Sequence, residues 1–203
     1  DPEWEIRDLD GNPIPDEQLP FRQVRDTGEP LYGFRHTIRW PDGTEKILLV
    51  NGAPLFDENG NADSVVCSLT DITEQWEYEE RLKKSTARLE ALFENSPEMI
   101  DIHTADGTIV DVNEQFCEVF NQPKDELIGQ KVWEIDQERE REELQDMWDE
   151  MDVGDRLELE TEFATKHGIR FPVEVRLTRL PVEDGDRFMV VSRDITERKQ
   201  RLQ

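Results

Sequence analysis

Only a few side chains in this sequence are of the types that act as nucleophiles, bases or metal ligands. There are three histidines, His36, His103 and His167, and two cysteines, Cys67 and Cys117. A zinc site, or a nucleophile activated by a base, needs such residues at short spacings or in one site, and here they are scattered along the chain. The sequence therefore predicts structural or surface roles for the histidines.

Acidic residues are far more numerous, but they form runs and not pairs. The runs at 138–143 and 149–155 fit the solvated face of a helix better than the paired acid and base of a hydrolytic site. The sequence has no glycine-rich phosphate-binding loop. A histidine kinase would need a phosphoacceptor histidine on a helix, and His36 lies in a predicted strand. We therefore expect no enzyme within this chain, with an enzyme of unknown type as a third possibility.

The most informative motif is a four-residue sequence, Asp-Ile-Thr-Glu, that occurs twice, at 71–74 and 194–197. Each copy follows a run of β-type residues and precedes a charged segment. An acceptor side chain with a glutamate three positions later is typical of a helix N-terminus, because the first side chain accepts from free backbone N–H groups and the glutamate reaches back to the cap. Each copy therefore predicts a joint between the last strand of a sheet and an outgoing helix. The residues of the two joints are Asp71, Thr73, Glu74, Asp194, Thr196 and Glu197.

The composition is strongly acidic, with 49 acidic against 24 basic residues and a formal net charge of -25. This charge argues against nucleic acid or an anionic membrane surface as a partner. Hydrophobic residues make up 35% of the chain, but their patterning predicts folded domains. Such an acid-rich composition with few lysines resembles that of proteins from salt-loving archaea; an acidic bacterial cytosolic protein is the alternative.

The sequence also points to a location. The two cysteines fall in different repeats, so no disulfide framework is expected, and a reducing cytoplasm suits them. We find no signal peptide and no apolar run near the ~20 residues that a membrane span needs. The sequence therefore predicts a cytoplasmic protein, and its ends suggest a piece of a longer chain.

The first part of the chain is expected to form a small antiparallel sheet that ends at the first joint. Strands are predicted at 31–40, 46–55 and 64–70, joined by tight turns. A short strand over 4–9 and a short helix or turn within 16–26 precede them. This unit has little helix to cover its sheet.

A helix is predicted over 75–95. Leu82 and Leu89 lie seven residues apart, and Tyr78, Ser85 and Leu92 occupy the second seam of an imperfect heptad pattern. The pattern favours a coiled coil between two copies of the chain. The alternative is a single helix that packs this stripe on its own domain.

The second unit alternates strands and short helices in a longer series. Two strands form a hairpin, Asn113 caps a short helix through Phe120, and a one-turn helix begins at Pro123. A longer helix and three strands complete the unit. Strands are expected at 99–103, 108–112, 157–165, 169–180 and 187–195, and the longer helix at 138–151.

This order of elements, with several short motifs, resembles the PAS (sensory box) domain family. The motifs are Ala-Leu-Phe-Glu-Asn-Ser-Pro at 91–97, Asp-Gly at 106–107, Asp-Val-Asn at 111–113, the helix residues 116–120, Glu-Leu-Ile-Gly at 126–129, Gly168, and Asp-Ile-Thr-Glu-Arg at 194–198. The resemblance implies an α+β fold with a five-stranded antiparallel sheet and short helices on one face. The chain is thus expected to hold the C-terminal part of a first PAS-like domain (1–73), a helical linker (74–96), a complete PAS domain (97–196) and the start of an outgoing signalling helix (197–203).

The resemblance implies a regulatory module. Such domains detect a small molecule, a redox change or a partner, and they relay the signal through helices to an output domain such as a histidine kinase or a transducer of a two-component system. A homodimer formed through the linker helices is implied as well. The alternative is a ligand-free dimerisation or spacer module in the same kind of protein.

Two common cofactor types are disfavoured by comparison with the family. Flavin-binding relatives carry a cysteine in a run that corresponds to 129–134 here, and this run has none. Cys117 lies one helix earlier and is expected to be a small buried apolar residue. Haem-binding relatives place a histidine on the long helix, and 138–151 contains none. The cofactor is therefore unknown, and a chain without one is the simpler expectation.

Any ligand pocket of such a domain would lie between the sheet and the short helices. If these side chains pack tightly they are simply the core, and if loosely they leave room for an apolar or aromatic ligand. The candidates are Ile102, Val112, Phe116, Phe120, Trp133, Trp148, Phe163, Val175 and Met189. A change there would alter the strand 187–195 and, through the joint, the outgoing helix. By family likeness, Asp194 is expected to pair with Arg176 or Arg179.

Overall fold

The computed structural model describes residues 4–60, 62–181 and 185–201. The chain divides into two compact units, Asp1–Ser85 and Thr86–Gln203. The last two residues of the predicted outgoing helix lie outside the described residues.

The first unit is a four-stranded antiparallel sheet in the order β1-β2-β3-β4. The three predicted main strands are present within two residues of their expected ends. Helix α1 lies against the sheet, where Val24 is fully buried and its Cγ2 would lie 3.0 Å from a Cβ added at Gly52. The elements are β1 (Glu5–Arg7), η1 (Asp16–Gln18), α1 (Pro20–Thr27), β2 (Leu31–Arg39), β3 (Glu45–Phe56) and β4 (Ala62–Asp71).

Helix α2 (Thr73–Glu94) begins two residues before the predicted helix and ends one residue earlier. It contains no buried residue. The heptad positions Tyr78, Leu82, Leu89 and Leu92 are each more than half exposed, at 63, 56, 64 and 63%. The alternative in which the helix packs this stripe on its own domain is therefore wrong.

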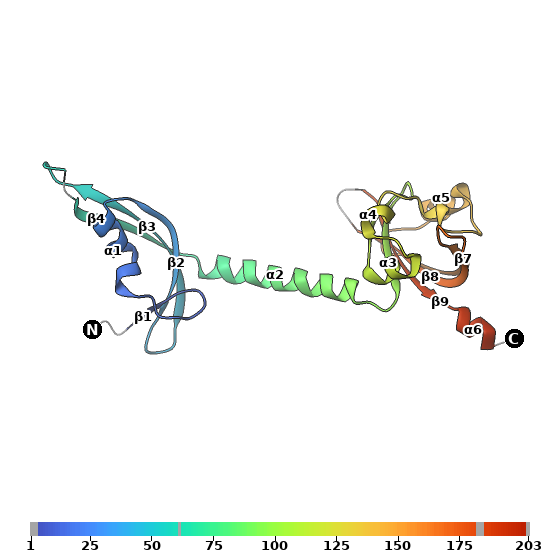
Figure 1. Ribbon diagram of the computed structural model, residues 1–203, viewed down its shortest axis with the longest axis horizontal. Coiled ribbons are helices and arrows are strands. Elements are labelled where there is room, and N and C mark those ends of the chain that lie inside the picture. The colour runs from blue at the N-terminus through green and yellow to red at the C-terminus, as the bar shows by residue number, and fades with distance from the viewer. Residues whose placement is uncertain (1–3, 61, 182–184, 202–203) are drawn as a thin grey trace. The chain divides into compact units, whose positions relative to one another are not determined.

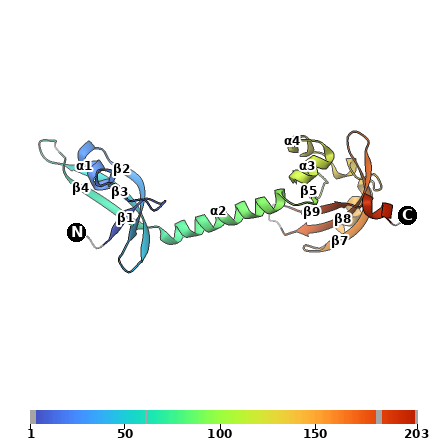
Figure 2. The ribbon, with the colours of Figure 1, turned by 60° about the horizontal axis from the view of Figure 1, so that its bottom comes forward.

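The second unit has the predicted five-stranded antiparallel sheet, in the order β6-β5-β9-β8-β7. Figures 1 and 2 show the short helices α3 and α4 on one side of this sheet. The elements are β5 (Met99–Thr104), β6 (Ile109–Val112), α3 (Glu114–Phe120), α4 (Lys124–Leu127), η2 (Val132–Glu134), α5 (Arg141–Asp149), β7 (Arg156–Ala164), β8 (Arg170–Leu180), β9 (Arg187–Asp194) and α6 (Thr196–Arg201).

The core of this unit lies between the sheet and the helices. The rings of Phe116 and Phe120 stack at 4.5 Å, and the ring of Phe120 meets the edge of Phe171 at 6.0 Å. The predicted cap Asn113 is confirmed, since its Oδ1 accepts from the N–H of Phe116 at 3.1 Å. The same amide group donates to the carbonyl of Phe93 at 3.1 Å and so ties the end of α2 to this unit.

Helix α5 starts at Arg141, three residues after the predicted start. The cause is a polar turn, in which Oδ1 of Asp136 accepts from the backbone N–H groups of Glu138 at 2.9 Å and Arg139 at 3.1 Å. The turn holds these donors outside the helix.

The two units share one strand register. Leu48 pairs with Asp71 in the first unit as Val173 pairs with Asp194 in the second. Counted from these pairs, strands β2, β3 and β4 correspond to β7, β8 and β9. The pair Ile6–Ile38 likewise corresponds to the bridge Asp136–Phe163, so the first unit repeats the later part of the second.

Candidate functional site

The inner face of the second sheet carries polar side chains in its most buried part. On β5, Met99, Asp101 and His103 point inward, and Asp101 and His103 are only 4 and 1% exposed. Ser192 of β9, opposite Met99, is 1% exposed. The more hydrophobic alternate residues of β5, Ile100 and Ile102, lie on the outer face.

A cavity of about 50 Å³ lies between this face and the helices. Four of the nine predicted pocket residues line it: Phe116, Trp148, Phe163 and Val175. Val112 and Phe120 are buried elsewhere in the core.

Three of the predicted pocket residues are wrongly placed by the sequence. Ile102 and Met189 are partners across β5 and β9 on the outer face of the sheet. The ring of Trp133 covers the turn at Gly107, between the cations of Lys131 at 5.3 Å and Arg141 at 5.2 Å.

Asp101 is the most perturbed acid among the cavity residues. Its Oδ2 has no hydrogen-bond partner within the described part of the chain. Burial raises the pKa of this carboxyl to about 8, because the charged form loses its hydration. Asp101 therefore holds its proton near neutral pH.

His103 beside it is held neutral. Its ring stacks on Phe188 at 5.3 Å and lies 4.6 Å from the ring of Trp148. Burial lowers the pKa of His103 to about 4. Nδ1 of His103 lies 2.9 Å from the carbonyl oxygen of Thr104. Because a carbonyl oxygen can only accept a hydrogen bond, Nδ1 carries the proton and donates it, and Nε2 is left as an acceptor.

Asp136 is the third titratable residue that lines the cavity, and it is well satisfied. Its Oδ1 accepts from Thr161 Oγ1 at 2.8 Å in addition to the two backbone donors of its turn. Its Oδ2 lies 3.8 Å from the guanidinium of Arg139. The uncompensated carboxyl of the cavity is therefore Asp101.

Sequence reasoning missed Asp101 and Asp136 and gave His103 no site. The β5 sequence Met-Ile-Asp-Ile-His-Thr alternates, but its isoleucines favour the wrong inner face. Met99 could have indicated the correct inner face, because this apolar residue alternates with Ile100 and Ile102 and lies on the same face as Asp101 and His103. The remaining cavity residues that were not predicted are Ile109, Val132, Ile135, Leu144, Met147, Leu159, Leu177 and Val190.

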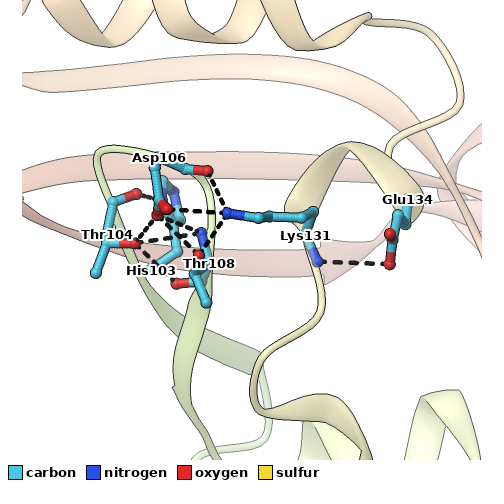
Figure 3. A network of polar contacts seen from close by, with 6 residues as sticks. All are labelled: His103, Thr104, Asp106, Thr108, Lys131 and Glu134. Atoms are coloured by element: carbon cyan, nitrogen blue, oxygen red, sulfur yellow. Dashed lines mark hydrogen bonds and ion pairs between the residues drawn. The ribbon is translucent and has the colours of Figure 1, made fainter.

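A polar network joins the β5–β6 turn to the loop that forms one wall of the cavity. Figure 3 shows Lys131 reaching from this loop to the turn, where its Nζ binds the carbonyl of Asp106 at 2.9 Å, Asp106 Oδ2 at 3.0 Å and Thr108 Oγ1 at 2.6 Å. Hydrogen bonds from Thr104, Thr108 and Lys131 hold the pKa of Asp106 well below its usual range. Val132, next to Lys131, lines the cavity, so the network fixes that wall.

The Asp71 part of the first joint is built as the motif predicts, but among the described residues Glu74 makes no hydrogen bond back to the cap. Asp71 Oδ1 accepts from the backbone N–H of Thr73 at 3.0 Å and from its hydroxyl at 2.5 Å, and Asp71 also pairs with Lys46 at 2.9 Å. The hydroxyl and backbone bonds of Thr73 and the bond from Lys46 lower the pKa of Asp71 to about 2. Thr73 Oγ1 in turn accepts from Ile47 N at 2.9 Å, which connects the helix start to β3.

The second joint repeats part of this arrangement. Asp194 Oδ1 accepts from Thr196 N at 2.7 Å. Ile195 N donates to Pro172 O at 3.0 Å, as Ile72 N donates to Ile47 O at 2.9 Å. Pro172 thus replaces Ile47, and because proline has no N–H it cannot donate to the Thr196 hydroxyl.

Two sequence expectations about the second joint are wrong. Arg176 pairs with Glu158 at 3.1 Å, and Arg179 pairs with Asp186 at 2.7 Å, so neither is the partner of Asp194. The register places both farther along β8 than Val173, which faces Asp194. Glu197 does not serve as a cap partner but pairs with Arg201 at 2.9 Å.

Ion pairs hold α6 to the sheet. Arg198 binds Glu174 of β8 at 2.8 Å and also Glu160 of β7, and Lys199 binds Glu160 at 3.0 Å. By register, Glu160 corresponds to Arg35 and Lys199 to Trp76. In the first joint these two positions form a cation–π contact, with the Arg35 guanidinium 5.4 Å from the ring centroid.

Comparison with known proteins decides the family. A model described as "PAS fold" matches residues 93–200, more than half of the chain, and a model described as "PAS domain" matches residues 5–74. The chain belongs to the PAS family. Its two units are a PAS-like part followed by a PAS domain, and PAS domains are sensory and not catalytic folds.

Several known proteins resemble this PAS chain. The PAS domain of an HTR-like protein from Haloarcula marismortui is 41% identical, with a TM-score of 0.55, over 59% of this chain and 98% of that one. Sporulation kinase E from Bacillus subtilis is 38% identical over 64 residues, which are 32% of this chain and 9% of that protein. A domain of a sensory box sensor histidine kinase/response regulator from Geobacter sulfurreducens is 25% identical, with a TM-score of 0.46, over 56% of this chain and 96% of that domain.

Three further observations concern membrane spans, metal sites and Cys117 in the described residues of this PAS chain. None of their helices is long and apolar enough to cross a membrane. They contain no group of three or more His, Cys, Asp or Glu that could hold a metal ion. Cys117 is half-buried on α3, where burial raises the pKa of its thiol.

Proposed function

We propose that this chain is a sensory PAS module that detects a signal in the core of its second unit and relays it through α6 to an output domain, such as a histidine kinase or a transducer. The observation that carries the proposal is the direct path from cavity to helix. Val190 of β9 lines the cavity, and Asp194 at the end of the same strand holds the first residue of α6. The domain boundaries proposed are 1–73, 74–96, 97–196 and 197–203.

The relay works as a shift between two poses of α6. A change in the cavity moves β5 or β9, because Asp101 and Val190 are paired across these strands. The position of Asp194 then changes relative to β8, where Glu174 holds Arg198. A signal acts by binding one pose more tightly than the other.

The test is to replace Asp194 by alanine. The Thr196 N–H loses its acceptor, at a cost of about 1 kcal/mol, which loosens the start of α6 but not the sheet. Amide exchange at Lys199, whose N–H donates to Ile195 O, should become several-fold faster, while exchange in β9 should not change. In the full-length protein the variant should uncouple output from its signal.

A matched control is Asp146→Ala, which removes an exposed acid of α5 outside the joint. This variant should leave both exchange and signalling unchanged. Normal signalling by Asp194→Ala in the full-length protein would rule out the joint as the relay.

The second candidate function is a ligand-free dimerisation or spacer module, and the exposed seam of α2 favours it. Four large apolar residues line this seam without a partner among the described residues, and a second α2 would bury them. A homodimer through α2 is compatible with either function. Acid-rich composition and the Haloarcula neighbour support an origin in a salt-loving archaeon, and the cytoplasm remains the proposed location.

Replacing Ser85 by leucine should tighten this dimer. Ser85 occupies the seam position between Leu82 and Leu89, so leucine there completes the apolar repeat and buries one more side chain per chain, worth about 2 kcal/mol each. The dissociation constant measured by analytical ultracentrifugation should fall at least tenfold. Ala87→Leu, on the opposite face of the helix, should leave it unchanged. An unchanged constant for Ser85→Leu would exclude α2 as the dimer interface.

A further inference from the structure

The cavity has the chemistry of a binding site for a small cation. Asp101 Oδ2 is buried beside it without a hydrogen-bond partner in the described chain, so the loss of its hydration is not compensated. The apolar residues around it provide no compensation. A ligand that donates hydrogen bonds would supply what this oxygen lacks.

The two other polar groups of the cavity, on Asp136 and His103, offer acceptor atoms. Asp136 offers carboxyl oxygens, and Nε2 of His103 carries a lone pair because Nδ1–H is used on the Thr104 carbonyl. Neither lysine nor arginine is found among the described residues that line the cavity. An anionic ligand would find no cation among these lining residues and a single donor, the O–H of the protonated Asp101 carboxyl, which disfavours it.

The apolar walls suit a cation as well. Phe116, Trp148 and Phe163 line the cavity, and aromatic faces attract cations within about 6 Å. Such attraction is stronger in a desolvated site than at the surface. Charge and walls therefore select the same kind of ligand.

The size of the cavity limits that ligand to very few atoms. Its volume is about 50 Å³. A water molecule takes a share of about 30 Å³ in the liquid. A primary ammonium group with one carbon atom matches this space, whereas a quaternary ammonium ion exceeds it.

We propose that the cavity binds a compact primary ammonium ion, of the size of methylammonium, through an ion pair with the Asp101 carboxylate. This inference rests on the proposed sensory function and names its ligand class. The Asp101 carboxyl releases its proton to solvent as the ammonium ion enters, so the complex has the same net charge as the free protein. Because Asp101 and Val190 are cross-strand partners, the new ion pair acts directly on β9.

The linkage to pH follows from the proton that must leave. The pKa of Asp101 is raised to about 8, so the ionised fraction increases with pH up to that value. His103 and Asp136 are the other titratable residues that face the cavity, and His103, with a pKa of about 4, stays neutral above pH 6. Methylammonium stays protonated in this range, as a lysine amine does. Its affinity should therefore rise on the order of 50-fold between pH 6 and pH 8.

The experiment is a titration of the whole chain with methylammonium chloride, followed by NMR of the labelled methyl groups of Ile109, Leu144 and Val190. All three residues line the cavity. We expect saturable shifts at these methyl groups, with the stated dependence on pH. Methanol, which is neutral, and tetramethylammonium chloride at equal ionic strength should give no saturable shift.

Two variants separate specific binding from attraction to the acidic surface. Asp101→Asn should lower the affinity for methylammonium at pH 8 at least tenfold, whereas Asp146→Asn, which removes an exposed charge, should not change it. Equal affinity in Asp101→Asn, or no saturable shift in the wild type, overturns the proposal. The amide-exchange test of Asp194→Ala needs no added ligand, so a failure of methylammonium to bind would not contradict the proposed relay. A failure of the relay would likewise leave the methylammonium binding result unchanged.

Discussion

Replacing Asp101 by asparagine should change how the stability of the second unit depends on pH. In the wild type, the pKa of Asp101 is raised by burial from 3.8 in the unfolded chain to about 8 in the folded chain. A raised carboxyl pKa contributes stability that is fully present below pH 3.8 and is lost as pH rises toward 8. Between pH 4 and pH 8, the variant should therefore gain on the order of 5 kcal/mol in free energy of unfolding relative to the wild type.

His103 makes the wild-type profile distinctive, because its shift has the opposite sign. Burial lowers the pKa of this residue from 6.5 to about 4, so its contribution is present above pH 6.5 and is lost as pH falls toward 4. Between pH 4 and pH 6.5 the two slopes cancel, and only the Asp101 slope remains up to pH 8. The summed contribution of these two groups to wild-type stability is therefore flat from pH 4 to pH 6.5 and then falls by about 2 kcal/mol up to pH 8.

The measurement is urea unfolding at several pH values, followed by NMR signals of the second unit. The Asp101→Asn variant should instead lose about 3 kcal/mol as pH falls from 6.5 to 4, owing to His103. His103→Gln should show the reverse, a continuous loss as pH rises. A constant difference between wild type and Asp101→Asn across this range would show that Asp101 ionises normally in the folded protein.

Replacing Gly107 by alanine should destabilise the second unit by about 2–4 kcal/mol. The backbone of Gly107 has φ +73°, a left-handed conformation that costs a residue with a Cβ about 1 kcal/mol or more. The added Cβ would also lie 2.9 Å from Cε3 of the Trp133 ring and closer still to Cζ3. The ring would have to leave the turn, which would disturb the Lys131 network.

Gly168→Ala is the matched control, since Gly168 has a similar φ of +78° but no atom within 4 Å of an added Cβ. This variant should cost only about 1 kcal/mol. The excess cost in Gly107→Ala should largely disappear when Trp133 is also replaced by alanine, measured by urea unfolding against the single Trp133→Ala variant. Equal costs for the two glycine variants would show that Trp133 does not pack on the turn.

Sequence patterns predicted the fold well, because the strand and helix signals are local. The repeated joint motif located the ends of β4 and β9, and the Asn113 cap located the start of α3. Phe116 of α3, Trp148 of α5 and Phe163 of β7 reach the cavity as expected, since large aromatic side chains on core-facing positions are mostly buried.

The polar part of the candidate site was not predictable by the same reasoning. Hydrophobic alternation assigns Ile102 to the inside of β5, and the structure reverses this by burying Asp101. Such reversals of a local rule are expected where a site takes precedence over stability. The partner of Arg176 depends on the register between β7 and β8, and the partner of Arg179, Asp186, lies just before β9; neither pairing is visible in a local pattern.

The two outgoing helices are held to their sheets by contacts of different kinds. Helix α2 uses the cation–π contact of Trp76 with Arg35, whereas α6 uses the ion pair of Lys199 with Glu160, so dissolved ions should affect the two contacts differently. Both side chains of the Lys199–Glu160 pair are nearly half exposed, at 48 and 45%, so mobile counterions screen this attraction efficiently. The contact of Trp76 with Arg35 retains its nonpolar part when charges are screened. We therefore expect concentrated brine to weaken the Lys199–Glu160 contact of the second unit more than the Arg35–Trp76 contact of the first.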